Sequence, residues 1–210
     1  MNTSVTATGM SVTAKSDSYF LEIAGSVNEG VYSTTGTNNL VGNLYPTAHE
    51  AWDALADIED FDMAVASTYD NWYFQYSAST SNASTSLTGK TYLSAFTNYV
   101  ATCTYSVRLN ANSGQATAYD LYVSSVTIPA NKGIKVIVAG AEGYSEFDES
   151  AATIPSGDVL SNTVTKTAQD IKVYIYFDGN DENVYSDNVS TLTGAVEFTL
   201  AVLSTDAPAA

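Results

Sequence analysis

The chain contains one cysteine and one histidine among its 210 residues. Because Cys103 is alone, it can form neither an intramolecular disulfide nor a thiolate metal cluster. Because His49 is alone, histidine-based Ser or Cys triads and multi-histidine zinc sites cannot be built within one chain. These two absences remove most enzyme mechanisms, and we expect a protein that is not an enzyme.

Charged residues are also scarce, at 14% of the chain, whereas an average soluble domain has about a quarter. They are mostly of one sign, since 23 are acidic and 7 basic, and the net charge is -16. Such a field repels phosphate backbones and anionic lipid, so we expect no nucleic-acid partner. Ser and Thr make up about a quarter of the chain, which indicates a surface rich in hydroxyl groups.

No apolar run reaches the 18 residues of a membrane-spanning helix, so we expect no membrane insertion. The start of the chain also lacks the charged and apolar regions of a signal peptide. We interpret Met1 as standing in place of a removed signal peptide. The expected location is therefore extracellular, secreted from or attached to a bacterial cell.

Alternation of apolar and polar residues with a period of two dominates the chain, as expected for half-buried strands. In residues 99–109, Cys103 and Tyr105 fall on the apolar face, so we predict that Cys103 is a buried core residue. Similar segments are 10–14, 19–23, 71–77, 119–123, 134–138, 171–177 and 195–202. This pattern predicts an all-β fold, an antiparallel β-sandwich or jelly roll. The turn at 110–114 predicts that strand 99–109 pairs with the next strand in a hairpin or meander.

One short helix is predicted near residues 48–58, because Thr47 and Glu50 fit a capping box and Trp52 begins a helical spacing of apolar residues. The Ser-, Thr-, Asn- and Gly-rich stretches 28–46, 78–90 and 140–168 are interpreted as long surface loops. We therefore expect three parts: an N-terminal strand or arm over 1–9, a single sandwich domain over 10–205, and a C-terminal tail over 206–210.

Acidic residues in the loop after strand 171–177 are the best candidate for a metal site. Asp178, Asn180 and Glu182 stand at alternate positions and could direct several oxygens at Ca²⁺. A solvated turn capped by Asn and Asp explains the same residues more simply. Calcium is thus the single cofactor that the sequence suggests.

Two other patterns indicate alternative functions. The sequence His49-Glu50-Ala51-Trp52-Asp53 is a partial match to the H-E-x-x-H helix of zinc proteases, but it lacks the second histidine. The aromatic row Trp72-Tyr73-Phe74-Gln75-Tyr76 could stack on sugars or on a partner, or fill the core of the sandwich.

The segment Val5–Ala14, together with Tyr19–Ile23 and the strand Val173–Asp181, resembles secreted Gram-positive proteins of the camelysin/TasA type, which are exported with a SipW-dependent signal peptide. The resemblance implies a jelly-roll subunit of biofilm-matrix fibres, in which the N-terminal strand of one subunit completes the sheet of the next. Camelysin is described as a metal-dependent protease, so the resemblance also implies a metalloprotease as a third candidate.

From these observations we expect a structural subunit of a cell-surface or biofilm-matrix filament, a homopolymer formed by donor-strand exchange. The predicted polymer interface is Val5, Thr6, Ala7 and Thr8, with Gly9 as a bend or bulge. A cell-surface adhesin or glycan-binding module is the alternative. Other matrix proteins or glycans are further candidate partners.

Overall fold

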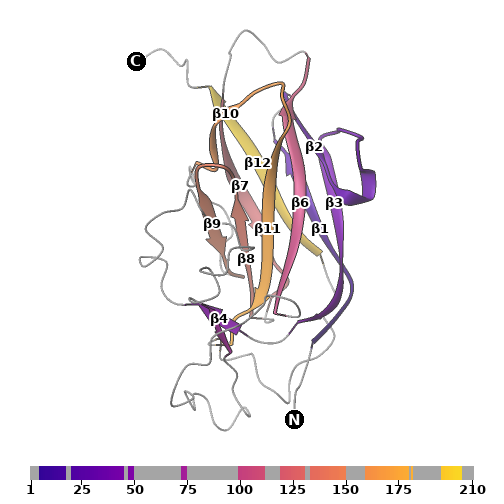
Figure 1. The fold of residues 1–210 in the computed structure, drawn as a ribbon, viewed down its shortest axis with the longest axis vertical. Coiled ribbons are helices and arrows are strands. Elements are labelled where there is room, and N and C mark those ends of the chain that lie inside the picture. The colour runs from indigo at the N-terminus through magenta and orange to yellow at the C-terminus, as the bar shows by residue number, and fades with distance from the viewer. Residues whose placement is uncertain are drawn as a thin grey trace.

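The structure is a computed structural model, and most of the residues that it describes lie in strands. The described residues are 5–17, 20–44, 47–49, 72–74, 99–111, 119–130, 133–149, 159–179, 181 and 195–204. Two five-stranded sheets pack face to face, as Figure 1 shows. The predicted all-β sandwich is therefore confirmed.

Sheet A has the strand order β10-β7-β12-β1-β3, and sheet B has the order β2-β6-β11-β8-β9. A separate two-stranded sheet pairs β4 with β5. The strand bounds in sheet A are β1 Val5–Ser16, β3 Thr35–Leu44, β7 Tyr119–Thr127, β10 Ser161–Val164 and β12 Ala195–Ser204. Those in sheet B are β2 Leu21–Ala24, β6 Val100–Leu109, β8 Ile134–Ala139, β9 Tyr144–Phe147 and β11 Gln169–Phe177. The remaining elements are β4 Thr47–His49, β5 Trp72–Phe74 and the short 3-10 helix η1 Ser26–Asn28.

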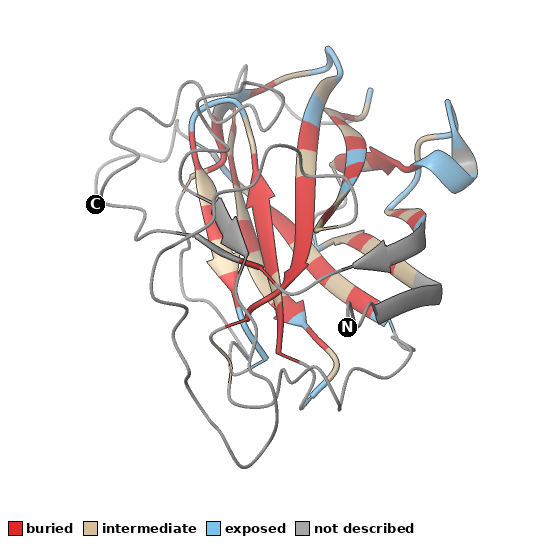
Figure 2. Ribbon diagram, turned by 60° about the horizontal axis from the view of Figure 1, so that its bottom comes forward, coloured by how far each residue is buried: buried red, intermediate tan, exposed pale blue. Residues whose placement is uncertain are grey.

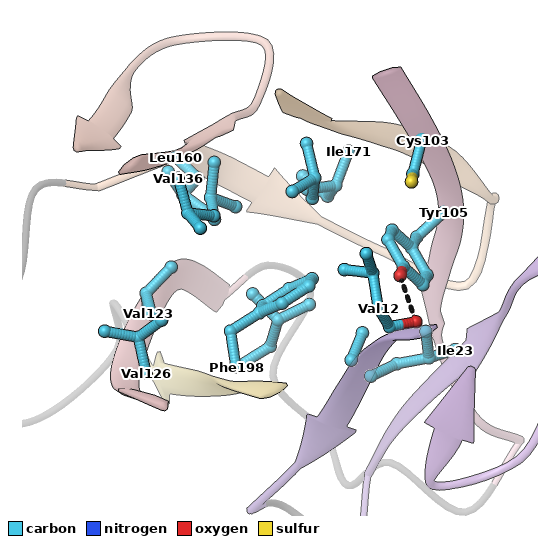
Figure 3. Close-up of a cluster of buried hydrophobic side chains, with 14 of the residues drawn as sticks. Val12, Ile23, Cys103, Tyr105, Val123, Val126, Val136, Leu160, Ile171 and Phe198 are labelled. Atoms are coloured by element: carbon cyan, nitrogen blue, oxygen red, sulfur yellow. Dashed lines mark hydrogen bonds between the residues drawn. The ribbon is translucent and has the colours of Figure 1, made fainter. Parts of the chain in front are cut away.

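The core lies between the two sheets and follows the predicted alternation. In β6, Cys103, Tyr105 and Val107 are buried while Thr102 and Thr104 are exposed. Figure 3 shows side chains of sheet B, such as Cys103 and Ile171, facing Val12 and Phe198 of sheet A. Figure 2 shows the buried residues running along the strands and the exposed ones gathered in the turns. Burial of alternate apolar residues on both inner faces is the main source of stability in such a sandwich.

Polar contacts tie the two sheets together at the β2–β3 side. The Tyr105 hydroxyl donates a hydrogen bond of 2.7 Å across the core to the Val12 carbonyl. Asn38 is buried on β3, where its Oδ1 accepts from the Ser26 amide and its Nδ2 donates to the Thr104 carbonyl. A buried amide with both ends bonded holds the edge of sheet A against sheet B.

The start of the predicted helix is wrong. Residues Thr47–His49 are a strand that pairs antiparallel with β5, with Thr47 opposite Phe74. The Thr47 carbonyl also accepts a hydrogen bond from the Gly179 amide. Pairing of the backbone with a distant segment thus outweighs the local capping signal at this point. The rest of the predicted helix lies outside the described residues.

Three further predictions are corrected: the hairpin after segment 99–109 and the loops over 28–46 and 140–168. β6 and β7 do not form a hairpin, because β6 belongs to sheet B and β7 to sheet A. The stretch 28–46, interpreted as a loop, contains β3, an edge strand of sheet A. Likewise, the stretch 140–168 contains the short strands β9 and β10. The stretch 78–90 lies outside the described residues.

Candidate functional site

The pairing of β1 is the feature that bears most directly on the predicted polymer interface. β1 lies between β12 and β3 in sheet A. It runs antiparallel to β3 but parallel to β12, with Ser11 opposite Ala195 and Ser16 opposite Leu200. A parallel pair in an otherwise antiparallel sandwich brings the first and last described strands side by side and pointing the same way (Figure 1).

This parallel pair is offset at both ends. Among the described residues, the first part of β1, residues 5–10, pairs with β3 alone, because β12 begins opposite Ser11. At the other end, β12 continues through residues 201–204, which pair with β7 but extend beyond the end of β1. We call residues 5–10 the β1 overhang and residues 201–204 the β12 overhang.

The predicted interface residues fall in the β1 overhang. Val5, Thr6 and Ala7 lie opposite Leu44, Asn43 and Gly42 of the same chain. The register then shifts between Ala7 and Met10, so the stretch Thr8–Gly9 contains an irregularity of the bulge type. The predicted bend or bulge at Gly9 is therefore confirmed. In the single chain this segment is paired with its own β3, and one edge of its backbone faces away from β3.

The backbone directions in the β12 overhang follow from one hydrogen bond. The Asp17 amide donates to the Leu200 carbonyl at 3.1 Å, so the polar backbone groups of Leu200 point toward the β1 side. Successive residues of a strand point their backbone groups to opposite sides. Those of Val202 and Ser204 consequently point to the β1 side too, beyond the place where β1 ends. Leu203, between them, is one of the exposed large apolar residues of the described chain.

The candidate calcium ligand Asp178 lies at the opposite end of the molecule from the β12 overhang, just after β11. Its carboxylate accepts from the Lys135 ammonium of β8 at 2.8 Å, and only 12% of its side chain is exposed. Its amide donates to the carbonyl of Gly133, which has a φ of 60°. Asn180 and Glu182 lie outside the described residues. Within the described ranges no group of three potential metal-binding side chains is found.

Lys135 is surrounded by acidic groups on the outer face of sheet B. Burial lowers the pKa of Lys135, but the hydrogen bond and charge of Asp178 and the charges of Glu146 and Asp148 raise it, and the net pKa lies above the ordinary value. Glu146 accepts a hydrogen bond from the Tyr176 hydroxyl. A bound Ca²⁺ would therefore have to compete with Lys135 for the Asp178 carboxylate.

Cys103 is a buried structural residue, as predicted. It is 5% exposed and lies on β6 opposite Val173 of β11. Burial raises the pKa of its thiol to about 12. A thiol of this kind is almost entirely protonated at neutral pH, so it is neither a nucleophile nor a metal ligand there.

For the remaining candidate site residues, the structure describes only the backbone. His49 ends β4 and pairs with Trp72 of β5, and its side chain lies outside the described residues. The same holds for the aromatic row, of which Trp72–Phe74 is strand. No helix in the described part of the chain is long and apolar enough to cross a membrane. Comparisons with protein-family models, with curated proteins and with solved structures found no match to this chain.

Proposed function

We propose that this chain is a structural subunit of an extracellular filament, on the cell surface or in a biofilm matrix, whose copies join head to tail through the N-terminal segment of β1. The observation that supports the proposal is the offset between β1 and β12. Among the described strands, the β1 overhang has no part of β12 beside it and the β12 overhang has no part of β1 beside it, and the two overhangs lie at opposite ends of this strand pair. A second copy shifted along the strand axis would bring its β1 overhang beside the β12 overhang of the first.

In such a junction the β1 overhang would lie parallel to the neighbour's β12, as β1 does within each chain. The β12 overhang would offer the amides and carbonyls of Val202 and Ser204, which point to this side. The incoming segment need not leave its own β3, because β3 occupies only its other edge. Full donor-strand exchange, in contrast, would require the pairs at Val5–Ala7 to open first.

The energetics indicate that one junction is weak. Val202 and Ser204 each have one amide and one carbonyl, so they can form up to four hydrogen bonds with the incoming segment. Each bond has a net value of about 1 kcal/mol. Burial of Val5 against the neighbour would add roughly 1.5–3 kcal/mol. Their sum, about 6 kcal/mol, is comparable to the 4 kcal/mol or more that association costs in translational and rotational freedom. We therefore expect filaments only at high protein concentration.

Charge repulsion sets a second condition for assembly. Each copy carries a net charge of -16, so neighbouring copies repel each other. Salt screens such repulsion, and the screening length falls to roughly 10 Å at 0.1 M ionic strength. Added salt should therefore promote filament formation, whereas it would weaken an assembly held by pairs of opposite charges.

The alternative functions do not require copies of the chain to assemble. An adhesin or glycan-binding module would use the aromatic row that begins at Trp72, and it would stay monomeric in any salt. A metalloprotease would show metal-dependent cleavage. Ordered filaments are expected only for a structural subunit, which makes electron microscopy the measurement that separates the three.

The experiment is negative-stain electron microscopy of the purified protein over a series of protein and salt concentrations. We expect filaments from the native chain, and none from a variant that lacks residues 2–8. Ser204→Pro should also prevent filaments, because proline removes an amide that points to the junction. Ser204→Ala, which keeps that amide, is the matched control and should still assemble. Filaments that persist after both the deletion and Ser204→Pro would refute the proposal, as would a native chain that stays monomeric under every condition.

A further inference from the structure

Lys135, Asp178 and Glu146 lie on the outer face of sheet B, and the first two are in contact. Lys135 of β8 lies opposite Tyr176 of β11, so Asp178, two residues further on, is its diagonal neighbour on the same face. Glu146 of β9 lies opposite Ile137, which places it on the same face from the other side. Lys135 thus has a carboxylate on either side, Asp178 just after β11 and Glu146 on β9.

The contact within this group is short and mostly shielded from water. The Lys135 Nζ lies 2.8 Å from Asp178 Oδ2, with side-chain exposures of 31% and 12%. Tyr176 and Ile137, which flank Lys135 on this face, are 1% and 0% exposed. The Tyr176 hydroxyl donates to Glu146 and so links the two strands on either side of β8.

We propose that Lys135 and Asp178 condense to form an intramolecular amide cross-link, with Glu146 as the proton carrier. An amine and a carboxyl group held at this distance resemble the reactants of an intramolecular reaction, for which effective concentrations reach roughly 10⁵ M or more. Surface ion pairs rarely meet this condition, because their long side chains are free to separate.

The reaction needs no further reagent. One proton moves from the Lys135 ammonium to the Asp178 carboxylate, which gives a neutral amine and a neutral acid. The amine nitrogen then bonds to the Asp178 Cγ, and Glu146 takes a second proton from the nitrogen. Glu146 returns that proton to the Asp178 hydroxyl, the C–O bond breaks and one water molecule leaves.

The charges around Lys135 determine the pace of this reaction. The ion pair is the resting state, with Lys135 Nζ 2.8 Å from Asp178 Oδ2. Only the minor neutral pair reacts, so cross-linking proceeds slowly after folding. A carboxylate that accepts and returns the proton typically accelerates such a step by about 10²–10⁴-fold.

The cross-link would fasten the start of β8 to the chain just after β11. It would close a loop that includes β9 and β10, both short edge strands. A covalent link between distant points restricts the unfolded chain and raises the melting temperature. The inference does not depend on the proposed function, because the reacting groups lie within one chain and at the opposite end from the β12 overhang.

The test is the intact mass of the full chain, measured in denaturant after prolonged incubation of the folded protein. We expect the mass to fall by that of one water molecule, and digestion should give a branched peptide in which Lys135 and Asp178 are joined. An intact mass equal to that of the sequence, with the two residues in separate peptides, would overturn the proposal.

Four variants identify the roles of the three residues. Lys135→Arg keeps a cation beside Asp178, and Asp178→Ala removes the acyl group, so both should keep the full mass. A loss of water that persists in Lys135→Arg would place the change elsewhere and refute the assignment. Glu146→Gln can still accept the Tyr176 hydrogen bond but cannot carry a proton, so cross-linking should slow about a hundredfold or more. Glu146→Asp should restore part of the rate. Cross-linking of Glu146→Gln at the native rate would exclude Glu146 as the proton carrier.

Discussion

The hydroxyl of Tyr105 is predicted to contribute about 2 kcal/mol to folding, because it donates a hydrogen bond of 2.7 Å across the core to the Val12 carbonyl of β1. Tyr105→Phe removes this hydroxyl but keeps the ring, which contacts Phe198 edge to face at a centroid distance of 5.4 Å. The loss of a buried hydrogen bond costs about 1 kcal/mol, and the carbonyl left behind adds about 1–3 kcal/mol at most. For a chain of this size, 2 kcal/mol corresponds to a fall in melting temperature of about 4–8 °C.

Urea unfolding of both proteins, with equal m-values, would measure this difference. Tyr32→Phe is the matched control, since the Tyr32 hydroxyl bonds the Ser106 hydroxyl at 2.8 Å in a part-buried position. We expect the control to lose less than about 0.5 kcal/mol. If Tyr105→Phe were no less stable than Tyr32→Phe, the cross-core hydrogen bond would not contribute to stability as argued.

The same hydroxyl should make the protein sensitive to alkali. Burial raises the pKa of Tyr105 above its ordinary value of 10.0, although the hydrogen bond with Asn38 opposes the shift. Below pH 10 the phenol is neutral in both states, and its contribution is fully present. Above pH 10 only the unfolded chain ionises, so stability falls by about 1.4 kcal/mol for each pH unit. Tyr105→Phe should lose stability less steeply than the native protein over that range.

Two further predictions concern Cys103 and the loop after β11. Cys103→Ser should lose about 1–3 kcal/mol, because a hydroxyl replaces a buried thiol, and a bulky thiol reagent should not label the native protein; rapid labelling would contradict the burial of this residue. If Asp178, Asn180 and Glu182 bind calcium, the melting temperature should be higher in millimolar calcium than in chelator, by an amount that corresponds to about 2.7 kcal/mol at a hundredfold excess over Kd. The calcium effect should be larger in Lys135→Gln, which removes the ammonium group that competes for the Asp178 carboxylate; equal melting temperatures in calcium and chelator for both proteins would exclude the site.

The strands that could be predicted from the sequence are those whose inward positions are apolar. In β12, Val196, Phe198 and Leu200 alternate with polar or small residues, and all three are buried. In β11, Val173 and Ile175 follow the same rule. Alternation reports directly on one buried face, so it predicts both the strand and the orientation of its side chains.

The missed strands present fewer apolar residues to the core. In β3, Gly36 and Asn38 are the buried positions, and Asn38 is held there by hydrogen bonds to Ser26 and Thr104. In β9, the buried positions are Ser145 and Phe147, so only one of the two is apolar. These are edge strands or neighbours of edges, where backbone pairing and a few polar bonds replace apolar burial. Hydropathy alternation cannot detect such segments.

The sequence could not predict which strands pair with each other, for a different reason. Residues 110–118 separate β6 from β7 in the sequence, but a short connection between strands can also cross from one sheet to the other. The parallel pair of β1 and β12 joins residues at opposite ends of the described chain. A local pattern does not specify such a partner. The β12 overhang could therefore be found only from this pairing and not from the alternation of Val5–Thr8.

The pairing of β1 also explains why the N-terminal segment can be both part of the fold and a candidate junction. Val12 and Ala14 are fully buried and lie where β12 and β3 flank β1 on both sides. Residues 5–10, by contrast, have only β3 beside them among the described strands. An unpaired strand edge is a template for pairing with another chain. Removal of residues 2–8 should therefore leave the doubly flanked part of β1 in place, so that a loss of assembly in this variant would report on the junction and not on the stability of the subunit.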